Sequence, residues 1–258
     1  MKIRIFRTEE QLADALARCV VQHLQEQPAT VLGLPTGRTP LPLYRALVAR
    51  HAKGESDYSK VTTFNLDEFV GIEPAHPGSY RSYMSEHLFR HVNVPQRRTQ
   101  FLDGQATDLD AECARFEDRI LRAGGIDLQI LGIGENGHIG FNEPAAELSP
   151  WSHRVKLTLA SRRANAGFFG GKLTDVPKEA LSMGMSTIMH ARSIVLMATG
   201  KRKAEIIAKT VSGAITTRIP ASLLQLHSKV EILLDEAAAS RLRSEGVVTS
   251  RGGRVHER

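Results

Sequence analysis

Short apolar runs alternate along the chain with longer segments in which apolar residues recur every three or four positions. The short runs are typical of buried strands and the periodic segments of amphipathic helices. The short runs predict strands at residues 2–6, 31–34, 61–65, 128–133, 155–159, 194–199 and 230–234. The periodic segments predict helices at residues 9–24, 40–48, 79–90, 108–123 and 201–211, and another that begins at 237.

Strands that alternate with helices form parallel sheets with helices on both faces. The 258 residues contain no sequence repeat, low-complexity linker or shift in composition that would divide them. We therefore expect one α/β domain over residues 1–240, an open, mostly parallel sheet with helices on both faces, of Rossmann-like type. Such sheets bind ligands beyond the carboxyl ends of their strands.

Two of the predicted helices have a recognisable start. Thr8 and Gln11 have the spacing of a capping box. Thr39 is expected to be an N-cap, with Pro40 at the first helical position.

Composition excludes a membrane protein, a secreted disulfide scaffold and a disordered chain. Hydrophobic residues make up 41% of the chain, yet no run approaches the roughly 20 apolar residues of a membrane-spanning helix. The N-terminal segment MKIRIFRTEE lacks the features of a secretory signal. Cys19 and Cys113 lie inside helical patterns, so we expect reduced cysteines and a cytoplasmic location.

The net charge of +6 is concentrated at the C-terminus. The last 18 residues, RLRSEGVVTSRGGRVHER, hold five arginines and two glutamates. The Gly/Arg-containing composition predicts a basic, flexible tail at residues 241–258. The alternative, a nucleic-acid-binding patch, is disfavoured because aromatic residues and a recognised nucleic-acid-binding motif are missing there. A mildly basic protein would also suit an anionic small substrate.

Four predicted strands end in loops rich in glycine, hydroxyl or ionisable groups. These loops are LPTGRTP (34–40), FNLDEFVG (64–71), GIGENGHIGFNEP (132–144) and ATGKRKA (198–204). Because parallel strands place their carboxyl ends at one edge of the sheet, we expect the four loops to share one site.

The first and last of these loops could bind a phosphate. LPTGRTP joins a strand to a helix start, where free N–H groups attract anions, but it lacks the spacing of a Walker A loop. ATGKRKA places Lys201, Arg202 and Lys203 at a helix start, against the helix dipole, which an anionic ligand would explain. An ordinary capped turn and a solvated surface are the alternatives.

The two middle loops carry groups suited to proton transfer. Asp67 or Glu68 could be a general base, or a carboxylate that is solvated or caps a helix. His138 lies on a glycine turn with Glu143 nearby, a pair suited to proton transfer near neutral pH. GIGENG matches a dinucleotide fingerprint, but FNEP follows it instead of a helix, and the spacing of His138 and Glu143 is unlike a metal motif.

Several segments in family order resemble the glucosamine-6-phosphate deaminases, also called glucosamine-6-phosphate isomerases. They lie between about Leu32 and His227 and read LGLPTGRTP, FNLDEFVG, HPGSYRSYM, LGIGENGHIGFNEP, ALSMGMSTI and PASLLQLH. The related 6-phosphogluconolactonases share the fold but differ after the histidine, where IGFNEP favours the deaminases. The resemblance implies conversion of glucosamine 6-phosphate and water into fructose 6-phosphate and ammonia, without metal or organic cofactor.

The resemblance also assigns roles to residues. Asp67 matches the base that moves a proton between C2 and C1, and His138 matches the group that opens the sugar ring, supported by Glu143 and Asn136. The positions that match phosphate-binding residues are Thr36, Gly37, Arg38, Thr39 and Lys203.

The chain departs from the family at three positions. Asn136 stands where many members have aspartate, Phe69 where many have tyrosine, and Gly167 where typical members place an arginine on the phosphate. Arg38 could replace that guanidinium.

The sequence therefore leaves alternatives to glucosamine 6-phosphate. The chain could act on galactosamine 6-phosphate or another 2-amino-2-deoxysugar phosphate, or hydrolyse a sugar-phosphate lactone as 6-phosphogluconolactonases do. A sugar-phosphate sensor would not need both Asp67 and His138. We expect a small sugar phosphate as partner, no nucleic acid or membrane, and leave a homo-oligomer open.

Overall fold

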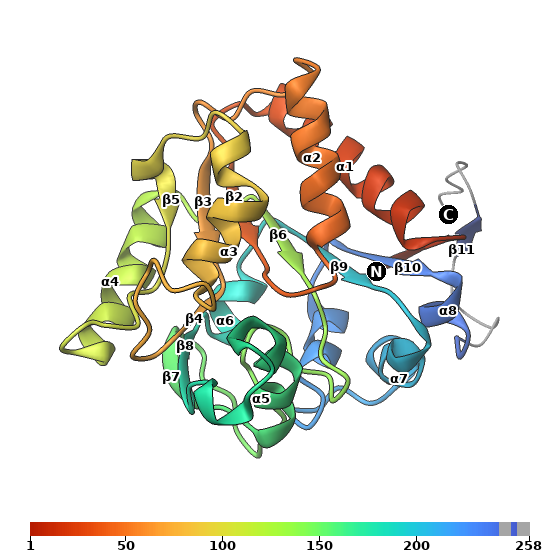
Figure 1. The fold of residues 1–258 in the computed structure, drawn as a ribbon. Coiled ribbons are helices and arrows are strands. Elements are labelled where there is room, and N and C mark those ends of the chain that lie inside the picture. The colour runs from red at the N-terminus through yellow and green to blue at the C-terminus, as the bar shows by residue number, and fades with distance from the viewer. Residues whose placement is uncertain (243–248, 252–258) are drawn as a thin grey trace.

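A computed structural model describes residues 1–242 and 249–251 and contains one large parallel sheet (Figure 1). Each neighbouring pair in this eight-stranded sheet is parallel. The strands in spatial order are β11 (Thr249–Arg251), β1 (Lys2–Phe6), β10 (Val230–Asp235), β9 (Ser193–Ala198), β6 (Leu128–Leu131), β2 (Val31–Leu34), β3 (Thr62–Asn65) and β5 (Thr99–Gln100). The predicted open parallel sheet is confirmed.

Helices cover both faces of the sheet, because alternate residues of the central strands point to opposite sides. Along β9, Val195 and Met197 pack with α1 and α2, whereas Ile194 and Leu196 pack with α4 and α7. No helix in the described part of the chain is long and apolar enough to cross a membrane. The helices are α1 (Glu9–Glu26), α2 (Leu41–Ala52), α3 (Tyr80–His87), α4 (Leu109–Arg122), α5 (Leu159–Asn165), α6 (Met185–Met189), α7 (Ala204–Ser212) and α8 (Glu236–Ala239).

A second, antiparallel sheet was not predicted. It has three strands, β4 (Asp67–Phe69), β8 (Glu179–Ser182) and β7 (His153–Lys156), and lies with α5 at the bottom of Figure 1. The predicted strand at 155–159 is wrong at its C-terminal half, since Leu159 already begins α5. The Thr158 side chain caps that helix by accepting the Ser161 N–H, which ends the extended conformation.

The two predicted helix starts have different outcomes. The Thr8 hydroxyl accepts the Gln11 N–H at 3.2 Å and therefore caps α1, as predicted. Thr39 does not cap α2. The N-cap is Pro40, which has no side-chain capping bond, and the helix begins at Leu41.

The expected flexible tail falls largely outside the described residues, which omit 243–248 and 252–258. Within it, Thr249–Arg251 form β11, which pairs in parallel with β1 at the edge of the large sheet.

Candidate active site

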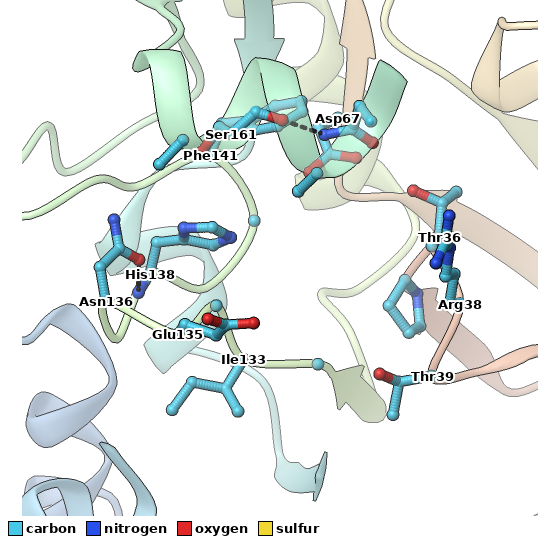
Figure 2. A pocket seen from close by; sticks show the side chains of 18 of the residues that line it. Thr36, Arg38, Thr39, Asp67, Ile133, Glu135, Asn136, His138, Phe141 and Ser161 are labelled. Carbon is cyan, nitrogen blue, oxygen red and sulfur yellow. Dashed lines mark hydrogen bonds between the residues drawn. The ribbon is translucent and has the colours of Figure 1, made fainter. Parts of the chain in front are cut away.

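The four loops singled out from the sequence line one pocket beyond the carboxyl ends of the large sheet, with a volume of about 750 Å³. Figure 2 shows His138 and Asn136 on one side and Thr36, Arg38 and Thr39 on the other, with Asp67 and Ser161 between them. All nine predicted site residues lie here, and all except Glu143 line the pocket directly. Glu143 lies behind the wall, in contact with His138 and Asn136.

The loop that follows β2 is held by its carbonyl groups. Asn65, Tyr44 and Tyr83 donate side-chain hydrogen bonds to the carbonyl oxygens of residues 34, 35 and 37, respectively. The N–H groups of residues 37–39 donate to no other group in the described chain. Gly37 turns the loop with a φ of +99°, which favours glycine. This arrangement leaves a row of backbone donors for an anion.

Lys203 is a partly buried cation at the wall of the site. Its Nζ donates to the carbonyl oxygen of Ile133 at 2.6 Å, and burial lowers the pKa of its ammonium group. Arg202 forms an ion pair with Glu135 at 2.7 Å, whereas Lys201 does not line this pocket. Of the three basic residues in ATGKRKA, Lys203 is therefore the one fixed at the pocket wall.

The adjacent carboxylates of Asp67 and Glu68 differ in their surroundings and in their hydrogen bonds. Glu68 accepts the backbone N–H groups of Phe69, Tyr80 and Arg81 and thereby fixes the start of α3. Asp67 is buried at the pocket wall, with only 7% of its surface exposed. Burial, and secondly the negative charge of Glu68, raise the pKa of Asp67 to about 8. Asp67 can therefore hold a proton near neutral pH, as a group that accepts and returns one must.

Glu143 collects donors from two directions. Its Oε2 accepts Asn136 Nδ2 at 2.7 Å and lies 3.5 Å from His138 Nδ1, while its Oε1 accepts the Ser161 hydroxyl. Burial would raise the pKa of Glu143, but the neighbouring His138 imidazole, in contact at 3.5 Å, and the hydrogen bonds from Ser161 and Asn136 lower it to about 2. Glu143 is thus a fixed anion beside the imidazole, able to set the orientation of the ring.

Glycines make room for the imidazole. A Cβ on Gly134 would overlap the ring of His138. Gly137 and Gly140 have φ angles of +91° and +57° and shape the turn on which His138 lies. The glycines of the dinucleotide-like pattern therefore hold a histidine, and no helix follows them before residue 159.

Helix α5 supplies wall residues that sequence reasoning did not identify. They are Ala160, Ser161, Arg163, Ala164 and Asn165. Thr158 and Ser161 have the spacing of an N-cap, which could have revealed the helix. Their position over the pocket has no local signal in the sequence.

Arg38 lies next to Gly167, one of the positions at which the chain differs from the resembled family. Its Nη2 is 3.1 Å from the point at which a Cβ on Gly167 would stand. The guanidinium of Arg38 therefore occupies space that a side chain at position 167 would enter.

Comparison with known proteins gives consistent results. Residues 7–233 match the family model described as glucosamine-6-phosphate isomerases/6-phosphogluconolactonase. The chain is 48% identical to the glucosamine-6-phosphate deaminase of Halothermothrix orenii, over 94% of this chain and all of the relative. It is 47% identical to glucosamine-6-phosphate deaminase 2 of Bacillus subtilis, over 95% of this chain and 98% of the relative.

Solved structures agree. A structure reported as a monomeric glucosamine-6-phosphate deaminase superposes with a TM-score of 0.91 at 42% identity, covering 93% of this chain and all of that chain. The 6-phosphogluconolactonase of Trypanosoma cruzi has a TM-score of 0.75 at 20% identity, covering 93% of this chain and 96% of that chain, which shows a shared fold.

Proposed function

The chain belongs to the family of glucosamine-6-phosphate isomerases and 6-phosphogluconolactonases, and from this premise we propose that it is a glucosamine-6-phosphate deaminase. The reaction converts glucosamine 6-phosphate and water into fructose 6-phosphate and ammonia. One observation carries the proposal: the Asp67 carboxylate and the His138 imidazole line the same pocket as Arg38 and Lys203.

In the proposed mechanism, His138 first opens the sugar ring. The imidazole takes the proton of the anomeric hydroxyl and returns a proton to the ring oxygen, giving an aldehyde at C1 and an amine at C2. Glu143 orients the ring through the contact at Nδ1, and Asn136 holds Glu143 by its hydrogen bond.

Asp67 then moves a proton from C2 to C1. Removal of the C2 proton, with uptake of a solvent proton by the C1 oxygen, gives an enolamine, and delivery of the proton from Asp67 to C1 gives an iminium group at C2. Addition of water to C2 and departure of ammonia leave the ketone of fructose 6-phosphate. The raised pKa of Asp67, about 8, supports a group that both accepts and donates the proton.

We assign the phosphate to Arg38, Lys203, the hydroxyls of Thr36 and Thr39, and the N–H groups around Gly37. The row of free N–H groups and the partly buried Lys203 ammonium group at the pocket wall support this assignment. Arginine and backbone donors form charge-assisted hydrogen bonds that favour a dianionic phosphate over a neutral hydroxyl.

The proposal is tested by measuring ammonia and fructose 6-phosphate from the purified protein. The substrates are glucosamine 6-phosphate, galactosamine 6-phosphate, glucosamine and 6-phosphogluconolactone, with Asp67→Asn as the matched inactive control. We expect equal amounts of both products from glucosamine 6-phosphate. If galactosamine 6-phosphate is the one substrate that yields ammonia, the assigned substrate is wrong. Lactone hydrolysis without ammonia release would refute the assignment as a deaminase. A cytoplasmic location remains a prediction.

A further inference from the structure

The first turn of α5 holds one oxygen of Glu143. The Ser161 hydroxyl donates to Oε1, and Thr158 Oγ1 lies 3.3 Å from the same atom. The other oxygen, Oε2, is the one that faces His138. A carboxylate is planar and rigid, so fixing Oε1 also fixes the direction in which Oε2 points.

The end of α5 is attached to the opposite wall of the pocket. Asn165 donates through Nδ2 to the carbonyl oxygen of Ser161 at 2.9 Å and accepts the Tyr80 hydroxyl at 3.0 Å. Tyr80 is buried, and its N–H donates to Glu68, the neighbour of Asp67. Helix α5 thus joins the wall that carries Asp67 to the wall that carries Glu143 and His138.

We propose that Ser161 is a positioning residue, which holds Glu143 so that His138 stays oriented toward the substrate that Asp67 also reaches. This inference rests on the proposed function for the identity of the reaction. Because α5 forms part of the pocket wall, the position of this helix and the orientation of the His138 ring are linked through the bond from Ser161 to Glu143. Asn136 holds Oε2 from the loop of His138 itself, whereas Ser161, together with Thr158 at the N-cap of α5, ties Glu143 to a separate element.

Three variants separate the hydroxyl from the helix. Ser161→Ala removes the donor, Ser161→Thr keeps a hydroxyl at the same carbon, and Leu159→Ala changes an exposed residue of the same helix turn. Loss of a hydrogen bond to a charged group typically lowers a rate or an affinity that depends on it by roughly ten- to a hundredfold. Since Asn136 and Thr158 still hold Glu143, we expect kcat to fall about tenfold in Ser161→Ala. KM should stay within about twofold, because Ser161 acts through Glu143.

A second measurement needs no turnover. The ring nitrogens of His138 are observed by ¹⁵N NMR at neutral pH and assigned with His138→Gln. We expect the Nδ1 signal to move in Ser161→Ala and to keep its wild-type position in Ser161→Thr and Leu159→Ala. An unchanged Nδ1 signal in Ser161→Ala would overturn the inference, as would the same displacement in Leu159→Ala.

The two proposals fail in different ways. If the wild-type protein releases no ammonia from any amino-sugar phosphate, the proposed function is wrong, while the NMR comparison still decides whether Ser161 positions the imidazole. If the wild type is active but Ser161→Ala retains its kcat and its Nδ1 signal, only the inference about Ser161 is wrong.

Discussion

Replacing Arg38 by alanine should weaken binding of the phosphate group specifically. Arg38 lies on a loop whose carbonyls are held by three buried side chains, and its Nη2 stands 3.1 Å from the Cβ position of Gly167. A charged hydrogen bond contributes about 1.5–3 kcal/mol, or roughly ten- to a hundredfold in affinity. Because Lys203 and the backbone donors remain, we expect a rise in KM within that range.

Steady-state kinetics with two substrates measure this effect. In Arg38→Ala, KM for glucosamine 6-phosphate should rise, while the rate measured with unphosphorylated glucosamine should stay near the wild-type value. Equal losses on both substrates would mean that Arg38 shapes the loop and does not bind the phosphate.

The neighbouring glycine provides the second half of the test. Gly167→Arg places a new side chain at 3.1 Å from Nη2 and brings two guanidinium groups together, so alone it should not improve KM. In the Arg38→Ala background, the new arginine at position 167 can enter the space that Arg38 has left and replace its charge. Gly167→Arg should therefore restore binding of the phosphate group there. This cycle should give a coupling of at least about 1 kcal/mol, the size typical of residues in contact.

One pattern would refute the reasoning. If Gly167→Arg alone improves KM more than tenfold while Arg38→Ala changes nothing, the two positions do not replace each other. The natural substrate would then carry a different or differently placed anion.

The remaining predictions concern the proton-transfer groups. Asp67→Asn should reduce kcat at least about 10²–10⁴-fold, with substrate binding retained in calorimetry; more than a tenth of wild-type turnover would contradict the assignment. Because the pKa of Asp67 is raised to about 8 in the folded state, the free energy of unfolding should fall as pH rises from about 4 to 8. Asp67→Asn should remove this fall, which is at most about 6 kcal/mol, as measured by denaturant unfolding at pH 8. For the same reason kcat/KM should rise with pH until about 8, and a flat profile between pH 6 and 8 would exclude Asp67 as the base. His138→Gln should slow reaction of the cyclic sugar more than later steps, and an unmoved pH–rate profile in Glu143→Gln would show that Glu143 does not support His138.

The sequence predicts the six inner strands of the large sheet and the loops that follow them because their signals are local. The edge strands β5 and β11, of two and three residues, were not predicted. Each buried strand is an apolar run, and parallel strands place their ends at one edge, so the meeting of four polar loops follows from strand order. The small sheet could not be predicted in this way. Its pairing of Asp67 with Ser182 joins three- and four-residue segments far apart in the sequence, and such short strands have no periodicity of their own.

In the candidate site, too, some residues could be predicted from the sequence and others could not. Asp67, His138 and Lys203 lie in the segments that follow predicted strands, so their positions on the pocket were predictable. Ser161 and Arg163 come from a seven-residue helix over the pocket. The contact of Ser161 with Glu143 depends on how β7 leads the chain back across the site, which is a matter of tertiary structure.

The Lys203 ammonium group is held in place by the protein itself. A free lysine side chain loses up to about 2 kcal/mol of rotamer entropy when it is immobilised. Here the bond to the Ile133 carbonyl fixes the chain and uses one of the three donors of Nζ, leaving two for a ligand. Much of the entropic cost of ordering the side chain is therefore met during folding, which makes the lysine a preorganised receptor for an anion.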